Sequence, residues 1–144
     1  MSATTDALGT AVDAENAAIF TYGVLTAFVS PARRQTVAED IAAHRSRRDA
    51  LVDAIRTAGA NPPEPATGYT LPVRVTDGVT AARAALAAEI DCAEADREIL
   101  ERAETADARR LGVDGLTESA LRASRWRAAL QQRPATVAFP GAPD

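Results

Sequence analysis

The sequence has 144 residues, of which 47% are hydrophobic and 25% are charged, and these values are typical of one soluble globular domain. A formal net charge of −4 argues against nucleic-acid binding, and the sequence shows neither a secretion signal nor an uncharged apolar run long enough to cross a membrane. Because neither signal is present, we expect a cytoplasmic protein. The single cysteine, Cys92, excludes an intramolecular disulfide and a cysteine-based structural zinc site, and it fits a reducing compartment.

Long alanine-rich segments without proline predict an all-α protein. The first helix is expected over residues 6–29. Ser30 and Pro31 then supply an N-cap and a proline in the first turn for a second helix over residues 31–58. Because the connection is so short, the two helices should form an antiparallel hairpin.

A proline-rich segment, "GANPPEPATGYTLPVRVTDG", follows the first hairpin and cannot be helical, since it has four prolines between Pro62 and Pro72. Its 18 residues from Ala60 to Asp77 can reach about 60 Å when extended, whereas a helix of this size is only about 40 Å long. The segment can therefore cross the whole bundle, which would make the second and third helices parallel. The remaining elements are expected to be helices over 78–104 and 107–131 and an irregular tail over 132–144. We treat residues 1–144 as one domain.

Apolar residues at alternating steps of three and four mark the face of each helix that lines the bundle. In the first three helices an ionisable residue interrupts this face near its middle, namely Glu15, His44 and Glu89. Glu15 lies fifteen positions before Ser30 and His44 fourteen after it, so an antiparallel hairpin places them within about 1.5 Å in height. A parallel third helix puts Glu89 nearly level with His44.

The fourth helix contributes a further charged pair at this height. Folding back from a turn near residue 105 brings Arg122 level with the other three residues, with Glu118 one turn away. A buried charge costs several kcal/mol unless it is paired, so these side chains should satisfy one another. We therefore predict a buried polar network of Glu15, His44, Glu89, Glu118 and Arg122.

This arrangement resembles the ferritin-like superfamily, with two antiparallel helix pairs and a long crossover. The segments "VDAENAAIFTYG", "AAHRSRRDAL" and "RASRWR" are similar to an uncharacterised family of actinobacterial ferritin-like domains of the DUF4439 type, and the likeness covers nearly the whole chain. Superfamily members that bind two metal ions use a Glu from each of two helices and a Glu-x-x-His pair from each of the other two. The resemblance implies that Glu15 and Glu89 take the single-Glu positions and that His44 takes a histidine position.

The sequence departs from that ligand pattern at two places. Ile41 stands where the first Glu-x-x-His pair needs its carboxylate, and "ESALR" around Glu118 lacks the second histidine but carries Arg122 one place further on. A guanidinium directed into the site would repel a metal ion. Our leading hypothesis is a non-catalytic bundle without a cofactor, which acts through dimerisation or partner binding. The alternative is a metal-binding protein or a small non-haem iron or manganese oxidase, with ligands drawn from Glu15, His44, Glu89 and Glu118.

The first helix carries more apolar surface than one core face can use. The segment "AAIFTYGVLTAFV", from Ala17 to Val29, is apolar around nearly its whole circumference and includes Phe20 and Phe28. Such a surplus predicts a homodimer through the first two helices, with cover by the crossover or the tail as the open alternative. Three other residues, Cys92, Tyr22 and Trp126, are expected to serve as core packing.

Overall fold

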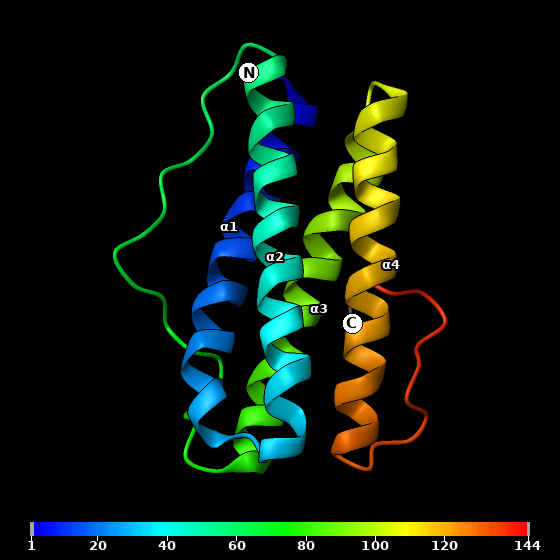
Figure 1. The fold of residues 1–144 in the computed structure, drawn as a ribbon. Coiled ribbons are helices and arrows are strands. Elements are labelled where there is room, and N and C mark those ends of the chain that lie inside the picture. Colours follow the sequence, from blue (N-terminus) through cyan, green and yellow to red (C-terminus); the bar gives the residue numbers. More distant parts are fainter. Residues whose placement is uncertain (1, 144) are drawn as a thin grey trace.

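The computed structural model describes residues 2–143, and its described part contains four long helices and no strand (Figure 1). The helices are α1 (Ala3–Leu25), which continues into the short 3-10 turn η1 (Thr26–Phe28), then α2 (Pro31–Thr57), α3 (Gly78–Arg102) and α4 (Ala106–Ala129). The main difference from the expected bounds is that α1 begins at Ala3, because Ser2 caps it by accepting a hydrogen bond from the Thr5 N–H.

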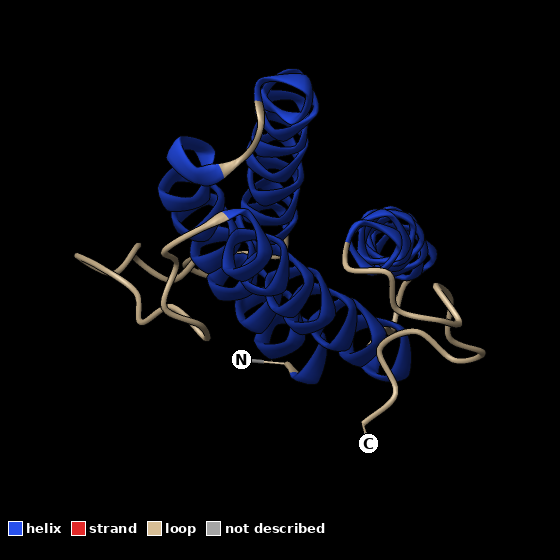
Figure 2. Cartoon of the chain, turned by 90° about the horizontal axis from the view of Figure 1, so that it is seen from below, coloured by secondary structure: helices blue, strands red, loops and turns tan. Residues whose placement is uncertain are grey.

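The crossover between α2 and α3 runs the length of the bundle. Figure 1 shows that α2 and α3 point the same way, with α1 and α4 antiparallel to them. Gly59 ends α2 with a positive φ of 80°, and Asp77 begins α3 with a capping box formed with Thr80. The predicted all-α architecture of two antiparallel hairpins joined by a long crossover is confirmed. Seen from below, the crossover and the C-terminal tail lie on opposite sides of the helices (Figure 2).

The four helices are not equally close to one another. Helix α3 packs closely against both α1 and α4, and α1 packs against α2, while α2 and α4 make few contacts. Gly112 permits the close approach of α4 to α3, because a Cβ there would lie 2.9 Å from Leu100 Cγ. This contact accounts for a glycine inside a helix, where it costs about 1 kcal/mol relative to alanine.

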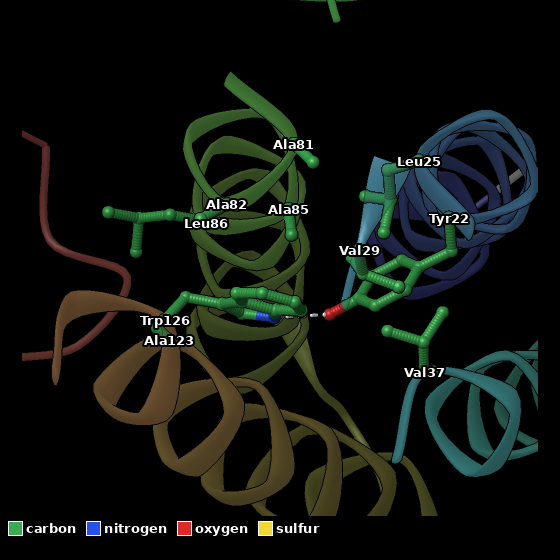
Figure 3. Close-up of a cluster of buried hydrophobic side chains, with 10 residues drawn as sticks. All are labelled: Tyr22, Leu25, Val29, Val37, Ala81, Ala82, Ala85, Leu86, Ala123 and Trp126. Atoms are coloured by element: carbon green, nitrogen blue, oxygen red, sulfur yellow. Dashed lines mark hydrogen bonds between the residues drawn. The ribbon is translucent and has the colours of Figure 1, made fainter. Parts of the chain in front are cut away.

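The hydrophobic core is divided into two main clusters. One surrounds Tyr22 and Trp126 near the η1 end of the bundle (Figure 3). The other surrounds Leu8, Leu51 and Ile99 near the opposite end. The level between them is occupied by polar and charged side chains. None of the described helices has the length and hydropathy that a membrane span requires.

Candidate functional site

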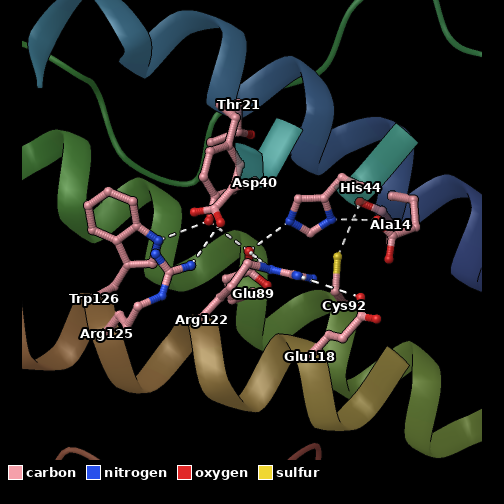
Figure 4. Close-up of polar contacts among 12 residues, drawn as sticks. Ala14, Thr21, Asp40, His44, Glu89, Cys92, Glu118, Arg122, Arg125 and Trp126 are labelled. Carbon is pink, nitrogen blue, oxygen red and sulfur yellow. Dashed lines mark hydrogen bonds and ion pairs between the residues drawn. The ribbon is translucent and has the colours of Figure 1, made fainter. Parts of the chain in front are cut away.

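His44 lies at the centre of the polar level and is completely buried. Its Nδ1 lies 2.5 Å from Glu15 Oε2. Its Nε2 lies 2.7 Å from Glu89 Oε1 (Figure 4). Ionised carboxylates only accept hydrogen bonds, and an imidazolium ring, protonated on both nitrogens, can donate to both of them. Burial on its own lowers the pKa of His44, but the hydrogen bonds and charges of Glu15 and Glu89 outweigh it and raise the pKa from 6.5 to about 9.

Glu89 is also completely buried, and its two oxygens have very different surroundings. Oε1 accepts hydrogen bonds from His44 Nε2 at 2.7 Å, the Tyr22 hydroxyl at 2.7 Å and Arg122 Nε at 2.9 Å. Oε2 has no hydrogen-bond partner among the described residues. Burial raises the pKa of Glu89, yet His44 above all, then Arg122 and Tyr22, bring that pKa below its ordinary value. Glu89 is therefore held as a carboxylate.

Tyr22 and Trp126 extend this network into the neighbouring hydrophobic cluster. Trp126 Nε1 donates to the Tyr22 hydroxyl at 2.9 Å, and that hydroxyl donates in turn to Glu89. Burial, followed by the charge of Glu89, raises the pKa of Tyr22 well above 10, so its proton stays in place. From the sequence, both aromatics are expected to serve as core packing, and their hydrogen bonds were not predicted. The signal available was that buried Tyr and Trp polar groups need a partner.

Arg122 points into the bundle, with only 7% of the residue exposed. Glu118 does not: its side chain is 49% exposed, and its Oε2 lies 3.7 Å from Arg122 Nη1. The prediction that Glu118 belongs to the buried network is therefore wrong. The inward position at this turn of α4 is taken by the neighbouring Ser119, which is completely buried, so Glu118 is directed to the outer side of the guanidinium.

A second buried ion pair lies one turn from His44 and was not predicted. Arg47 Nη2 donates to Asp96 Oδ1 at 2.8 Å, and both residues are buried. The alternation of three and four residues that includes His44 on α2 also includes Arg48, but Arg48 lies beside Asp49 with 30% of its side chain exposed. Gly115 of α4 leaves room for the Arg47 guanidinium, because a Cβ there would overlap it. Burial raises the pKa of Asp96 to about 7, against the opposing effect of Arg47.

Each buried carboxylate in the described part of the chain has a cationic partner. In addition to the pairs above, Arg125 Nη2 donates to Asp40 Oδ1 at 2.8 Å. The pairs are Glu15 and Glu89 with His44, Glu89 with Arg122, Asp96 with Arg47, and Asp40 with Arg125. Four acidic side chains thus face four basic ones, and above the pKa of Asp96, about 7, their charges balance within the bundle.

One group of side chains has a spacing suited to a metal ion. The ligand atoms of Glu15, His44 and Cys92 lie within 4.8 Å of one another. However, both ring nitrogens of His44 already face carboxylates. The Cys92 thiol lies 3.6 Å from the Ala14 carbonyl oxygen, and burial raises its pKa well above 9, so it stays protonated. These residues do not fit a pair of metal ions, because Ile41 replaces a carboxylate and Arg122 brings a positive charge.

Comparison with known proteins places the chain in a family. A family model described as a domain of unknown function (DUF4439) matches residues 7–144. The chain belongs to the DUF4439 family. A crystal structure of a conserved hypothetical protein from Mycobacterium tuberculosis is 40% identical, covers 89% of this chain and 97% of its own, and superposes with a TM-score of 0.86. No curated protein matches this DUF4439 chain.

More distant structures establish the fold of the DUF4439 protein. A dodecameric thioferritin from Bacteroides fragilis is 19% identical, with a TM-score of 0.76 over 89% of this chain and 84% of its own. A ferritin-like diiron-carboxylate protein from Bacillus anthracis is also 19% identical, with a TM-score of 0.71 over 88% of this chain and 94% of its own. The DUF4439 chain is therefore a ferritin-like protein in its fold.

Proposed function

We propose that this DUF4439 protein is a non-catalytic ferritin-like protein in which a buried network of Glu15, His44, Glu89 and Arg122 replaces the metal site. The observation that carries the proposal is that His44 and Arg122 both donate to Glu89 Oε1, at 2.7 and 2.9 Å. The two cationic side chains supply the positive charge that metal ions would otherwise supply. A divalent cation added to this balanced interior would leave excess positive charge in a region of low dielectric constant.

The scaffold would then act by association, and we propose a homodimer through α1 and α2. Phe20 and Phe28 of the first hairpin are each 39% exposed. The Tyr69 ring of the crossover lies 5.7 Å from the Phe20 ring, so the crossover covers part of this surface and leaves the part around Phe28 for a second subunit. Self-association has a precedent in this fold, since the thioferritin from Bacteroides fragilis is described as dodecameric. A cytoplasmic location stays a prediction.

Elemental analysis tests the absence of a metal site. Untagged protein is incubated with ferrous iron, manganese or zinc, desalted, and measured for metal per chain. We expect far less than one ion per chain, and we expect added ferrous iron to be oxidised no faster than in buffer. One tightly held ion per chain that is lost in His44→Ala would overturn the proposal.

A single-metal site is the second candidate function, supported by the close grouping of Glu15, His44 and Cys92. Under this alternative, His44 gives up its proton to become a ligand, and Cys92 ionises on binding. The variant Cys92→Ala separates the two proposals. It would lose metal if the alternative holds, whereas it would leave the metal content at background if the network replaces the metal.

A further inference from the structure

The C-terminal tail, residues 132–143, turns back beside α4 (Figure 1). It forms a strap that lines a groove together with residues of α3 and α4. At its start, the Gln132 N–H donates to the Arg127 carbonyl oxygen at 2.9 Å. Near its end, Gly141 has a φ of 77° and lies so close to the Ala93 carbonyl of α3 that a Cβ would overlap it. The strap therefore starts directly from the closed last turn of α4 and packs against α3 near its own end.

A cavity of about 810 Å³ lies between this strap and the two helices. Its walls include Leu86, Ile90, Ala120 and Ala123 from the helices and Val137 and Phe139 from the strap. The small alanine side chains on the helices leave space that the strap does not fill. This volume lies within the range of small-molecule binding sites, roughly 300–1,000 Å³.

Large apolar side chains surround the cavity and remain in contact with solvent. Leu121 is 64% exposed, Val137 47% and Phe139 74%, and all three line the cavity. Exposed large apolar side chains are rarely grouped in this way on the surface of a monomer unless the group forms a binding site. An apolar ligand would remove this surface from water.

Arg127 gives the cavity a charge that no residue of the described chain neutralises. Its half-buried side chain lines the cavity and has no hydrogen bond or ion pair with a described residue. The other two arginines on the same stretch of α4, Arg122 and Arg125, are both paired with carboxylates. The unpaired guanidinium therefore favours an anionic group on the ligand.

The shape of the cavity favours an elongated ligand. It extends along α3 from Leu86 to Glu94, which is eight residues or about 12 Å of helix. Arg127 lies at the start of the strap, whereas Glu94 lies beside Ala93, where the strap ends. A head group at Arg127 would therefore place the hydrocarbon chain along α3.

We propose that the cavity binds a free long-chain aliphatic carboxylate, with its head group at Arg127 and its hydrocarbon chain between the α3–α4 groove and the strap. The site lies outside the buried network and does not depend on the proposed function. The same chemistry occurs in acyl chains of membrane phospholipids, so vesicles form a separate arm of the test.

Calorimetric titration of the full chain with saturated carboxylates of about eight to sixteen carbons tests the site. We expect one ligand per chain and an affinity that rises roughly fourfold per added methylene until the chain fills the cavity. Arg127→Gln should weaken carboxylate binding at least about tenfold and leave the affinity for the alcohol of equal length within about twofold. The control, Arg34→Gln, removes an equal charge from the exposed surface of α2. It should change neither the affinity for the carboxylate nor the affinity for the alcohol.

Ala120→Trp provides a variant that fills the cavity without altering its charge. It should abolish binding of both the carboxylate and the alcohol while the helical circular dichroism is retained. Absence of binding to the whole series, or binding unaffected by both Arg127→Gln and Ala120→Trp, would overturn the proposal. Binding to phosphatidylcholine vesicles without binding of free carboxylates would assign the patch to membranes instead, and a dimer that Phe139→Asp converts to a monomer would assign it to a second copy.

Discussion

His44 of α2 and Glu89 of α3 meet through Nε2 and Oε1 at 2.7 Å, although they are 45 positions apart in the sequence. The same Glu89 oxygen also accepts from Tyr22 of α1 and Arg122 of α4. One carboxylate oxygen thus joins all four helices at the level where the two main apolar clusters are separated. The loss of any donor should therefore affect the stability of the whole bundle.

The variant His44→Ala should lower the free energy of unfolding by about 3–5 kcal/mol, because it leaves Glu15 without its cationic partner and removes one donor from Glu89. Urea unfolding followed by circular dichroism measures the change. Arg45→Ala, at the next and exposed position of α2, is the matched control and should change stability by less than about 0.5 kcal/mol. A loss below about 1 kcal/mol for His44→Ala would show that the carboxylates do not depend on the imidazolium.

The pH dependence of His44 follows from its raised pKa. The folded value is about 9 and the ordinary value is 6.5, so its contribution to stability is fully present below about pH 6.5 and is lost as the pH rises through 9. The difference corresponds to on the order of 3 kcal/mol. Because the chain has a single histidine, NMR titration of its imidazole measures the pKa without assignment. A value at or below 6.5 would contradict the ion-paired imidazolium.

The helical hairpins and the height of the polar level could be predicted from local counting. Ser30–Pro31 fixed where α1 and α2 reverse, which placed Glu15 opposite His44, and the structure brings the two into contact. The prediction of a crossover along the whole bundle depended only on length, because the fully extended segment is longer than the helix that it runs beside. Both predictions require only the number of residues between two positions, which can be read directly from the sequence.

The side of each helix that faces α4 was harder to predict. A strict alternation of three and four selected Arg48, whereas the buried positions on α2 include Asp40 and Arg47, which form ion pairs with Arg125 of α4 and Asp96 of α3. Charged residues at these positions resemble an exposed face in the sequence. Only their pairing in space shows that they are inside, and no spacing in the sequence relates Arg47 to Asp96.

Gly115→Ala should destabilise the protein by about 1–3 kcal/mol, because the added Cβ would overlap the Arg47 guanidinium and force it away from Asp96. Gly23→Ala is the matched control in α1, since a Cβ there would meet nothing within 4 Å. The control should stabilise the helix by up to about 1 kcal/mol. Thermal or urea unfolding compares the two. Equal effects in both variants would show that Arg47 moves without cost.

Asp96→Asn should change how stability depends on pH. The pKa of Asp96 is raised from 3.8 to about 7 by burial, so its contribution is fully present below about pH 3.8 and is lost as the pH rises through 7. The wild type should therefore lose on the order of 4 kcal/mol between these limits through this group, and Asp96→Asn should abolish that slope. Asp53→Asn, on the exposed side of α2, should keep it. Parallel urea titrations across this range make the measurement, and an unchanged slope in Asp96→Asn would show that the carboxyl ionises freely in the folded protein.

Phe28→Asp should convert the proposed dimer to a monomer. The Phe28 side chain lies at the end of the first hairpin and is 39% exposed, and a carboxylate placed in an apolar interface between two copies would lose its hydration without gaining a partner. Light scattering coupled to size-exclusion chromatography, at micromolar concentrations, measures the mass. Phe139→Asp makes the same chemical change on the C-terminal strap, where the side chain is 74% exposed, and it should leave the dimer intact. A monomeric wild type, or a dimer that withstands Phe28→Asp, would exclude association through this hairpin. The crossover, through Tyr69, would then be the only described segment that covers the surplus apolar face of α1.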